Sequence, residues 1–149
     1  MACIQLIADT EGEIALTAAT AKTVLQLVAA SNHRIKILSF GVFFDGVNVV
    51  GEPVQVRILR QSDAGTMSSA TPRKIGVYSE TLQTTAQKTA TAEPSAGDVI
   101  DVFEVHPQNG YEKYWPLGQE IIVAGGGRIG IECTAPEAVN VRAKFTAEE

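Results

Sequence analysis

Residues 128–146, RIGIECTAPEAVNVRAKFT, decide the fold class, because apolar and polar residues alternate in two runs on either side of a proline-containing linker. In the second run the residues of one parity are apolar and those of the other are mostly polar: Val139, Val141, Ala143 and Phe145 against Asn140, Arg142, Lys144 and Thr146. A period of two separates the faces of a strand and is typical of a half-buried antiparallel sheet. The linker at residues 135–138 turns the chain, so the two runs predict a terminal β-hairpin.

The same pattern continues upstream. Further short apolar runs, separated by Gly, Asn and Pro turn signals, lie at residues 54–58, 75–77, 99–105, 111–115 and 121–123. Residues 20–30 fit a helical period as well as a strand period, and we expect a strand because several of them are β-branched. In RIKILSFGVFF, residues 34–44, the apolar parity switches, which predicts a bulge near Leu38 and Ser39.

Two segments without an alternating pattern are expected to be long loops, namely residues 61–72 and the Thr- and Ala-rich residues 79–97. About eight to ten short strands remain, which predicts an all-β antiparallel sandwich or jelly roll forming one domain over residues 1–149. Residues 1–12 carry apolar Ile4, Leu6 and Ile7. They are either an arm that adds to a neighbour's sheet edge or an ordinary first strand.

Composition excludes several classes of protein. The chain has 149 residues, 12 Lys and Arg against 17 Asp and Glu, a net charge of -5, and a charged share of 19%. A chain with 45% apolar residues and so little charge is not disordered, and an acidic chain with scattered basic residues does not favour nucleic acid. We also expect no membrane partner and synthesis in a cytoplasm, because no long apolar run and no basic signal region is present.

Motifs that carry chemistry are missing from the sequence. His33 and His106 stand alone in predicted turns, and the glycines at residues 125–127 precede a strand pattern, so we expect surface histidines and a hairpin rather than a metal site or a phosphate loop. The carboxylates Asp98, Asp101 and Glu104 are expected on a solvated sheet edge. We therefore assign no catalytic, metal-binding or cofactor-binding residue and expect no enzyme.

The two cysteines and a small aromatic group remain. Cys133 lies in an apolar strand pattern and is expected as a buried free thiol, although a bridge to Cys3 stays open. Tyr111, Tyr114 and Trp115 are either part of the core with its rim or a contact surface.

Three long stretches carry a family resemblance. They are IALTAATAKTVLQLVAASNHRIKILSFGVFFDG (14–46), QTTAQKTATAEPSAGDVIDVFEVHPQNG (83–110) and PLGQEIIVAGGGRIGIECTAPEAVNVRAKF (116–145). Together they resemble small β-sandwich virion structural proteins of tailed bacteriophages, nearest to capsid decoration, or cement, proteins. The match lies in the order and spacing of residues along these stretches rather than in a catalytic motif.

The resemblance implies a non-enzymatic homotrimer on the capsid surface of the virion, with the major capsid protein as its partner. It carries no catalytic residue or cofactor over to this chain. Candidate interface residues are Ile4, Leu6, Ile7, Tyr111, Tyr114 and Trp115. An alternative is a carbohydrate- or receptor-binding jelly-roll module of a tail or fibre, or a tumour-necrosis-factor-like domain. A cupin-like metalloenzyme is disfavoured because the chain has only two isolated histidines.

Overall fold

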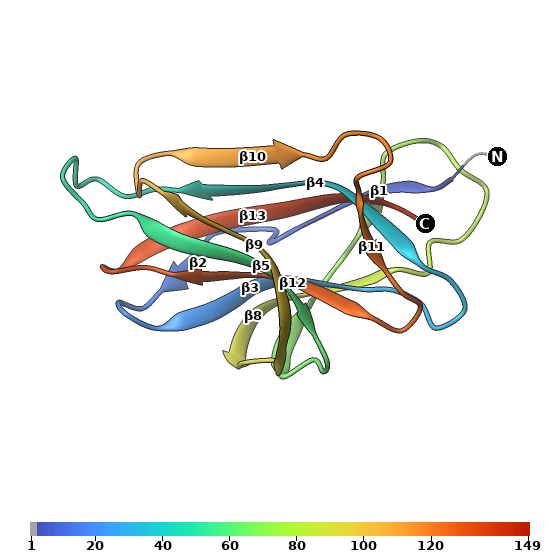
Figure 1. The fold of residues 1–149 in the computed structure, drawn as a ribbon, viewed down its shortest axis with the longest axis horizontal. Helices are drawn as coiled ribbons and strands as arrows, with labels where there is room; N and C mark the ends of the chain where they lie inside the picture. Colours follow the sequence, from blue (N-terminus) through green and yellow to red (C-terminus); the bar gives the residue numbers. More distant parts are fainter. Residues whose placement is uncertain (1–2) are drawn as a thin grey trace.

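The computed structural model describes residues 3–149 as two antiparallel β-sheets packed face to face (Figure 1). Sheet A consists of β10 (Gly110–Tyr114), β4 (Ile35–Phe44), β13 (Val139–Glu148), β1 (Gln5–Asp9) and β7 (Arg73–Lys74) in that order, with β11 (Ile121–Val123) beside β4 and β2 (Ile14–Leu16) beside β13. Sheet B consists of β6 (Thr66–Ala70), β8 (Thr85–Ala92), β3 (Ala21–Val28), β12 (Arg128–Thr134), β5 (Val54–Gln61) and β9 (Ala96–Val105) in that order.

The strand order is that of a jelly roll. Four neighbouring strands of sheet A, β10-β4-β13-β1, face four of sheet B, β3-β12-β5-β9, and the chain passes from one sheet to the other at most of the connections between them. Two four-stranded antiparallel layers connected in this way are the double-sheet jelly-roll architecture. The predicted antiparallel β-sandwich is therefore confirmed.

The core lies between the sheets, where the alternating apolar residues of both inner faces meet. Phe40 of β4 and Phe145 of β13 are fully buried from sheet A, and Leu27 of β3 and Ile131 of β12 from sheet B. The run quoted first therefore supplies strands to both sheets, since β12 belongs to sheet B and β13 to sheet A. The two runs are consecutive, but they do not pair with each other as the predicted terminal hairpin requires.

Two bulges explain the irregular patterns in the sequence. Thr146 pairs with Ser39 and Ala147 pairs with Ile37, so Leu38 of β4 is left without a partner on β13. This confirms the bulge predicted at Leu38 and Ser39. In β3 the pairing with β12 likewise skips Val24. One extra residue in a strand shifts the inward parity, which is why residues 20–30 fit two periods although they form a strand.

The expectation of two long loops is wrong. Residues 79–97 contain all of β8 and the beginning of β9, and residues 61–72 contain β6. β8 pairs with β3 on one side and β6 on the other, but it turns only Ala86 and Ala90 fully inward. Alanine is large enough to fill the inward positions at this end of sheet B. The sequence of β8 therefore shows no strong apolar alternation. These and other short strands raise the number in the described chain to 13, above the predicted eight to ten.

The N-terminal segment is an ordinary strand. β1 pairs with β13 over five residues, and Leu6 is completely buried in the core of its own subunit. The arm interpretation is wrong for residues 5–9, because their main-chain groups and inward side chains are already engaged. Residues 1–2 of the predicted arm lie outside the described residues.

Candidate functional site

One edge of each sheet lies on the same side of the sandwich. β9 is the last strand of sheet B and pairs with β5, and β10 is the last strand of sheet A and pairs with β4 (Figure 1). Apolar side chains are exposed along both strands, and Val99, Ile100 and Val102 of β9 with Tyr111 of β10 are together called the edge patch. A ten-residue edge strand with exposed apolar side chains is a ready surface for another chain.

The predicted aromatic group divides between two environments. Tyr111 is 41% exposed, and its ring centroid lies 4.7 Å from that of Phe103 on β9. Trp115 lies 5.3 Å from Phe40, so Tyr111 and Trp115 belong to one cluster that closes the gap between the sheets. Tyr114 is 67% exposed and its hydroxyl donates to Glu112, away from that cluster. The three residues therefore do not form a single platform.

An ion pair also joins the two edge strands. The Lys113 Nζ of β10 lies 2.6 Å from the Asp101 Oδ2 of β9 and 5.6 Å from the centre of the Trp115 ring. Asp98 and Glu104 are exposed on β9, as predicted for a solvated sheet edge. The pair links β9 of sheet B to β10 of sheet A, which supports the shape of the edge patch.

A second exposed apolar surface lies at one end of the sandwich, in the loop between β4 and β5. Val47, Val49 and Val50 are 90%, 74% and 84% exposed, and we call residues 46–51 the valine loop. In Figure 1 it is the teal loop at the left-hand end. The sequence predicted a turn at Asp45 and Gly46 but not this surface, and the only signal is an apolar stretch enclosed by two turn motifs.

The base of the valine loop is anchored by hydrogen bonds. The Gly46 N–H donates to the Pro107 carbonyl at 2.7 Å, and a Cβ at Gly46 would lie 2.6 Å from that oxygen, so only glycine allows the approach. Asp45 accepts from the main chain and the side chain of Asn140 at 2.9 and 2.8 Å. The Val50 N–H donates to the Asn48 side chain at 3.1 Å. These contacts define the conformation in which the valines are exposed.

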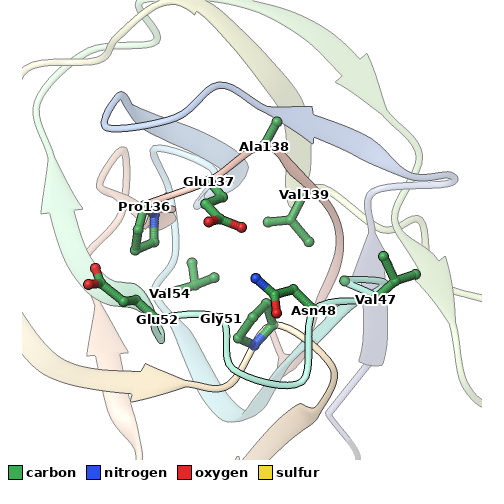
Figure 2. Close-up of a pocket in the computed structure, with 11 residues that line it drawn as sticks. Val47, Asn48, Gly51, Glu52, Val54, Pro136, Glu137, Ala138 and Val139 are labelled. Atoms are coloured by element: carbon green, nitrogen blue, oxygen red, sulfur yellow. The ribbon is translucent and has the colours of Figure 1, made fainter.

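Two hollows border the valine loop, and a third adjoins one of them at Glu52. Figure 2 shows the one between this loop and the β12–β13 turn, lined by Val54, Pro136 and Val139, with Glu52 and Glu137 among the residues around it. A second hollow continues past Glu52 to Gln55 and Glu104, and a third lies between Leu16, Asp45 and Ala138. The valine loop and its hollows form one surface, which we call the loop end.

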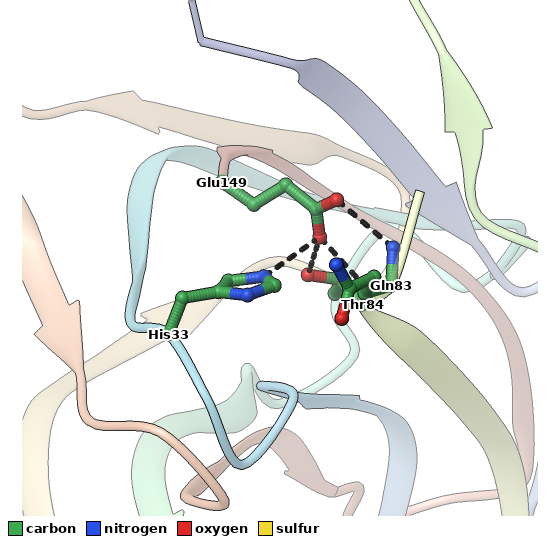
Figure 3. Close-up of polar contacts among 4 residues, drawn as sticks. All are labelled: His33, Gln83, Thr84 and Glu149. Carbon is green, nitrogen blue, oxygen red and sulfur yellow. Dashed lines mark hydrogen bonds and ion pairs between the residues drawn. The ribbon is translucent and has the colours of Figure 1, made fainter. Parts of the chain in front are cut away.

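The opposite end of the sandwich contains a clasped carboxylate (Figure 3). The Glu149 side chain accepts from the main-chain N–H groups of Gln83 and Thr84 at 2.9 and 2.8 Å and from the Thr84 hydroxyl at 2.6 Å, and its Oε2 lies 3.4 Å from the His33 Nε2. Burial raises the pKa of this carboxyl, but these hydrogen bonds outweigh burial and hold the pKa below its ordinary value of 4.5. The clasp ties β13 to the start of β8.

We expect the clasp to make stability depend on pH. Because the folded-state pKa of Glu149 is depressed, its contribution is present above the ordinary pKa and is lost as the pH falls through the lower folded-state value. Glu149→Gln should therefore lower the melting temperature at pH 7, and the difference from wild type should shrink between pH 5 and pH 3. Calorimetry of both proteins across this range measures the effect.

Glu148→Gln is the matched control, since the Glu148 carboxylate pairs with Lys36 and is more exposed than that of Glu149. A Glu149→Gln deficit that stays constant with pH would contradict the assigned clasp.

The remaining candidate residues lie outside the edge patch and the loop end. Ile4 and Leu6 are buried in the core and Ile7 is half-buried on the outer face of sheet A, so the first two do not form an interface. The His106 ring accepts from the Gln108 N–H within its turn. Cys133 is a buried free thiol whose pKa is raised by burial, and Cys3 is free and exposed, so no bridge joins them.

Residues 3–149 contain neither a metal-binding cluster nor a membrane-spanning helix. They contain no group of three or more His, Cys, Asp or Glu side chains placed to hold a metal ion. No helix of that described range is long and apolar enough to span a membrane.

Comparisons with known proteins add a weak structural likeness. No protein-family profile matches the chain, and no curated protein matches it. The chain is similar in structure to a mitogen derived from Yersinia pseudotuberculosis, with 10% sequence identity over 94% of this chain and 84% of that chain and a TM-score of 0.35. A likeness at this level carries no argument about function, so the functional proposal rests on the surfaces described above.

Proposed function

We propose that this chain is a non-enzymatic structural protein of a tailed-bacteriophage virion, a capsid decoration protein that binds the capsid lattice as a homotrimer. The virion role rests on the sequence resemblance, and the observation that supports assembly is the edge patch. A stable assembly needs apolar area with little charge at the centre of each contact, and Val99, Ile100 and Val102 supply such area beside Tyr111.

A closed trimer also needs a second, different surface on each copy. In a cyclic trimer each contact is heterologous, so the edge of one copy meets another face of the next. The outer face of sheet A offers Phe43, Tyr114 and Ile122 as exposed apolar residues. We propose that the edge patch of one copy packs on this face of its neighbour. The mass in solution tests the trimer, which should be about 47 kDa, three times the 15.8 kDa of one chain.

Val102→Glu should separate the copies. Val102 is half-exposed on β9, so the change costs the single chain little, but burying a carboxylate without a partner in an interface is costly. We expect the mass by light scattering to fall from about 47 to 15.8 kDa at the same concentration.

The matched control for this change is Val77→Glu, at an exposed valine far from the edge patch, which should leave the trimer intact. A Val102→Glu protein that remains trimeric would show that the edge patch is not the contact. A wild-type protein that is a strict monomer would remove the trimer from the proposal.

A second candidate function is a carbohydrate- or receptor-binding module of a tail or fibre. The observation in its favour is the exposure of Tyr111 and Tyr114, because exposed aromatic rings stack on ligands and dominate contact surfaces. Binding of the wild-type chain to a glycan array, lost on Tyr114→Ala but kept on Tyr78→Ala, would favour this candidate over capsid decoration.

A further inference from the structure

We propose that the loop end is the surface that docks on the capsid, and that it fits a protein surface with an apolar hollow rimmed by lysine or arginine. This inference rests on the proposed function and names the docking end and the chemistry of its partner. Three observations carry it: the exposed valines, the anchored loop that presents them, and the sign of the surrounding charge.

The three valines of the loop form a contiguous, exposed apolar group. Val47, Val49 and Val50 are among the most exposed apolar residues of the described chain, and they lie within four positions of one another. Isolated exposed apolar residues are common, but a contiguous group marks an interaction site. The hydrogen bonds at Asp45, Gly46 and Val50 preform the loop, so little conformational entropy is lost when a partner covers it.

Charge determines the kind of partner. Carboxylates line the three hollows of the loop end, namely Asp45, Glu52, Glu104 and Glu137, whereas no lysine or arginine of the described residues lines them. The Lys22 ammonium donates to the carbonyl of Ala15, a residue that lines the third hollow. Hydrogen bonds from Asn140 lower the pKa of Asp45, so this carboxylate is ionised at neutral pH. An apolar prominence with an acidic surround complements an apolar hollow with a basic rim.

The same charge argues against a membrane surface. Apolar loops that enter a bilayer are normally helped by basic residues, because cellular membrane surfaces are anionic. Here the carboxylates would be repelled by the lipid headgroups. A protein partner is therefore the occupant that the observations favour.

The loop end and the edge patch share no residue, so one copy can use both at once. Three loop ends in a trimer would bind a repeating lattice together, and multivalent binding is much tighter than any single contact. A modest change at each loop end should thus have a large effect on capsid binding.

The test uses the full chain and assembled capsids that lack this protein, taken from the phage that carries its gene. Co-sedimentation measures the dissociation constant of the wild type and of a triple variant, Val47→Ser, Val49→Ser and Val50→Ser. We expect the triple variant to bind at least about tenfold more weakly. The matched control changes three exposed apolar residues at the other end of the sandwich, Ile75→Ser, Val77→Ser and Leu117→Ser, and should bind as the wild type does.

The salt concentration and two pairs of Glu→Gln changes test the basic rim expected on the partner. Raising sodium chloride from about 50 to about 500 mM should weaken wild-type binding, because screening reduces attraction between opposite charges. Glu52→Gln with Glu137→Gln should weaken binding at low salt and flatten this dependence, whereas Glu80→Gln with Glu120→Gln should change neither.

The possible outcomes separate the inference from the function. If the wild type and the valine variant bind capsids equally, the inference is overturned and capsid decoration stands. If the wild type binds no capsid, both the inference and the proposed function are overturned. Binding that salt strengthens would overturn the basic rim, and flotation with phosphatidylcholine–phosphatidylglycerol vesicles that the valine variant abolishes would assign the loop end to a membrane instead.

Discussion

Replacing Phe40 with alanine is expected to lower the free energy of unfolding by about 3–5 kcal/mol, the cost of emptying a large aromatic site in a packed core. Phe40 is completely buried, and its ring centroid lies 5.2 Å from that of Phe103, 5.3 Å from Trp115 and 6.3 Å from Tyr111. It is therefore the centre of the cluster that closes the gap between β9 and β10. Chemical denaturation measures the change.

Phe43→Ala is a matched control for the stability of the single chain, and both changes are compared in the Val102→Glu background because Phe43 also lies on the proposed trimer face. Phe43 lies on the same strand but points outward and is 40% exposed, so the same change should cost much less. Because Phe40 also supports Tyr111, we expect Phe40→Ala to weaken the proposed trimer. Equal losses of stability at the two positions would contradict the aromatic cluster as the support of the edge patch.

The second large effect is expected at Gln26, in a buried polar network on sheet B. The Gln26 Nε2 donates to the Gln61 Oε1 at 2.6 Å and to the Asp63 carbonyl at 3.0 Å, and its Oε1 accepts from the Arg128 Nη1 at 2.9 Å. Gln61 in turn donates to the Thr23 hydroxyl at 2.9 Å. Gln26 and Thr23 are completely buried and Gln61 nearly so, so each group depends on its protein partner.

Gln26→Leu keeps the volume of the side chain but removes all three hydrogen bonds. Leaving buried donors and acceptors without partners costs about 1–3 kcal/mol each when no water replaces them, and we expect a loss of about 2–4 kcal/mol in the free energy of unfolding. Denaturant titration of the variant gives this value.

The double variant Gln26→Leu with Gln61→Leu separates the network from simple packing. It removes both members of the central pair, so its loss should be smaller than the sum of the two single losses. Gln55→Leu, at an exposed glutamine of β5, is the control and should change stability by less than about 0.5 kcal/mol. Strictly additive losses for Gln26 and Gln61 would contradict the network.

Much of the fold follows from local pattern. The alternation around Val141 and Phe145 predicted an inner and an outer face, and the parity switch near Leu38 predicted the bulge that the pairing with β13 contains. β8 was missed because Thr, Ala and Gln form it, and only two of its alanines are fully buried. Pairing with β3 and β6 makes it a strand, and such pairing leaves no mark in the sequence of β8 itself.

The candidate surfaces were harder to predict. The sequence predicts that the aromatic group Tyr111, Tyr114 and Trp115 is either part of the core with its rim or a contact surface. The structure separates the three residues at β10, the edge strand of sheet A: Tyr111 and Trp115 join the aromatic cluster, and Tyr114 is exposed. Val47, Val49 and Val50 have the composition of a short strand. They stay outside the core because Asp45, Gly46 and Pro107 anchor the loop away from it.

By itself the sequence determined that this chain is an antiparallel sandwich, because a period of two in apolar residues can be buried only on one face of a strand. Only the tertiary structure decided which strands lie at the edges, which apolar residues remain exposed, and how four carboxylates come to line the hollows of the loop end. Those properties depend on contacts between residues far apart in the chain, such as Asp45 with Asn140 and Lys113 of β10 with Asp101 of β9. Burial and charge at a surface are set by spatial neighbours, and spacing along the chain does not specify them.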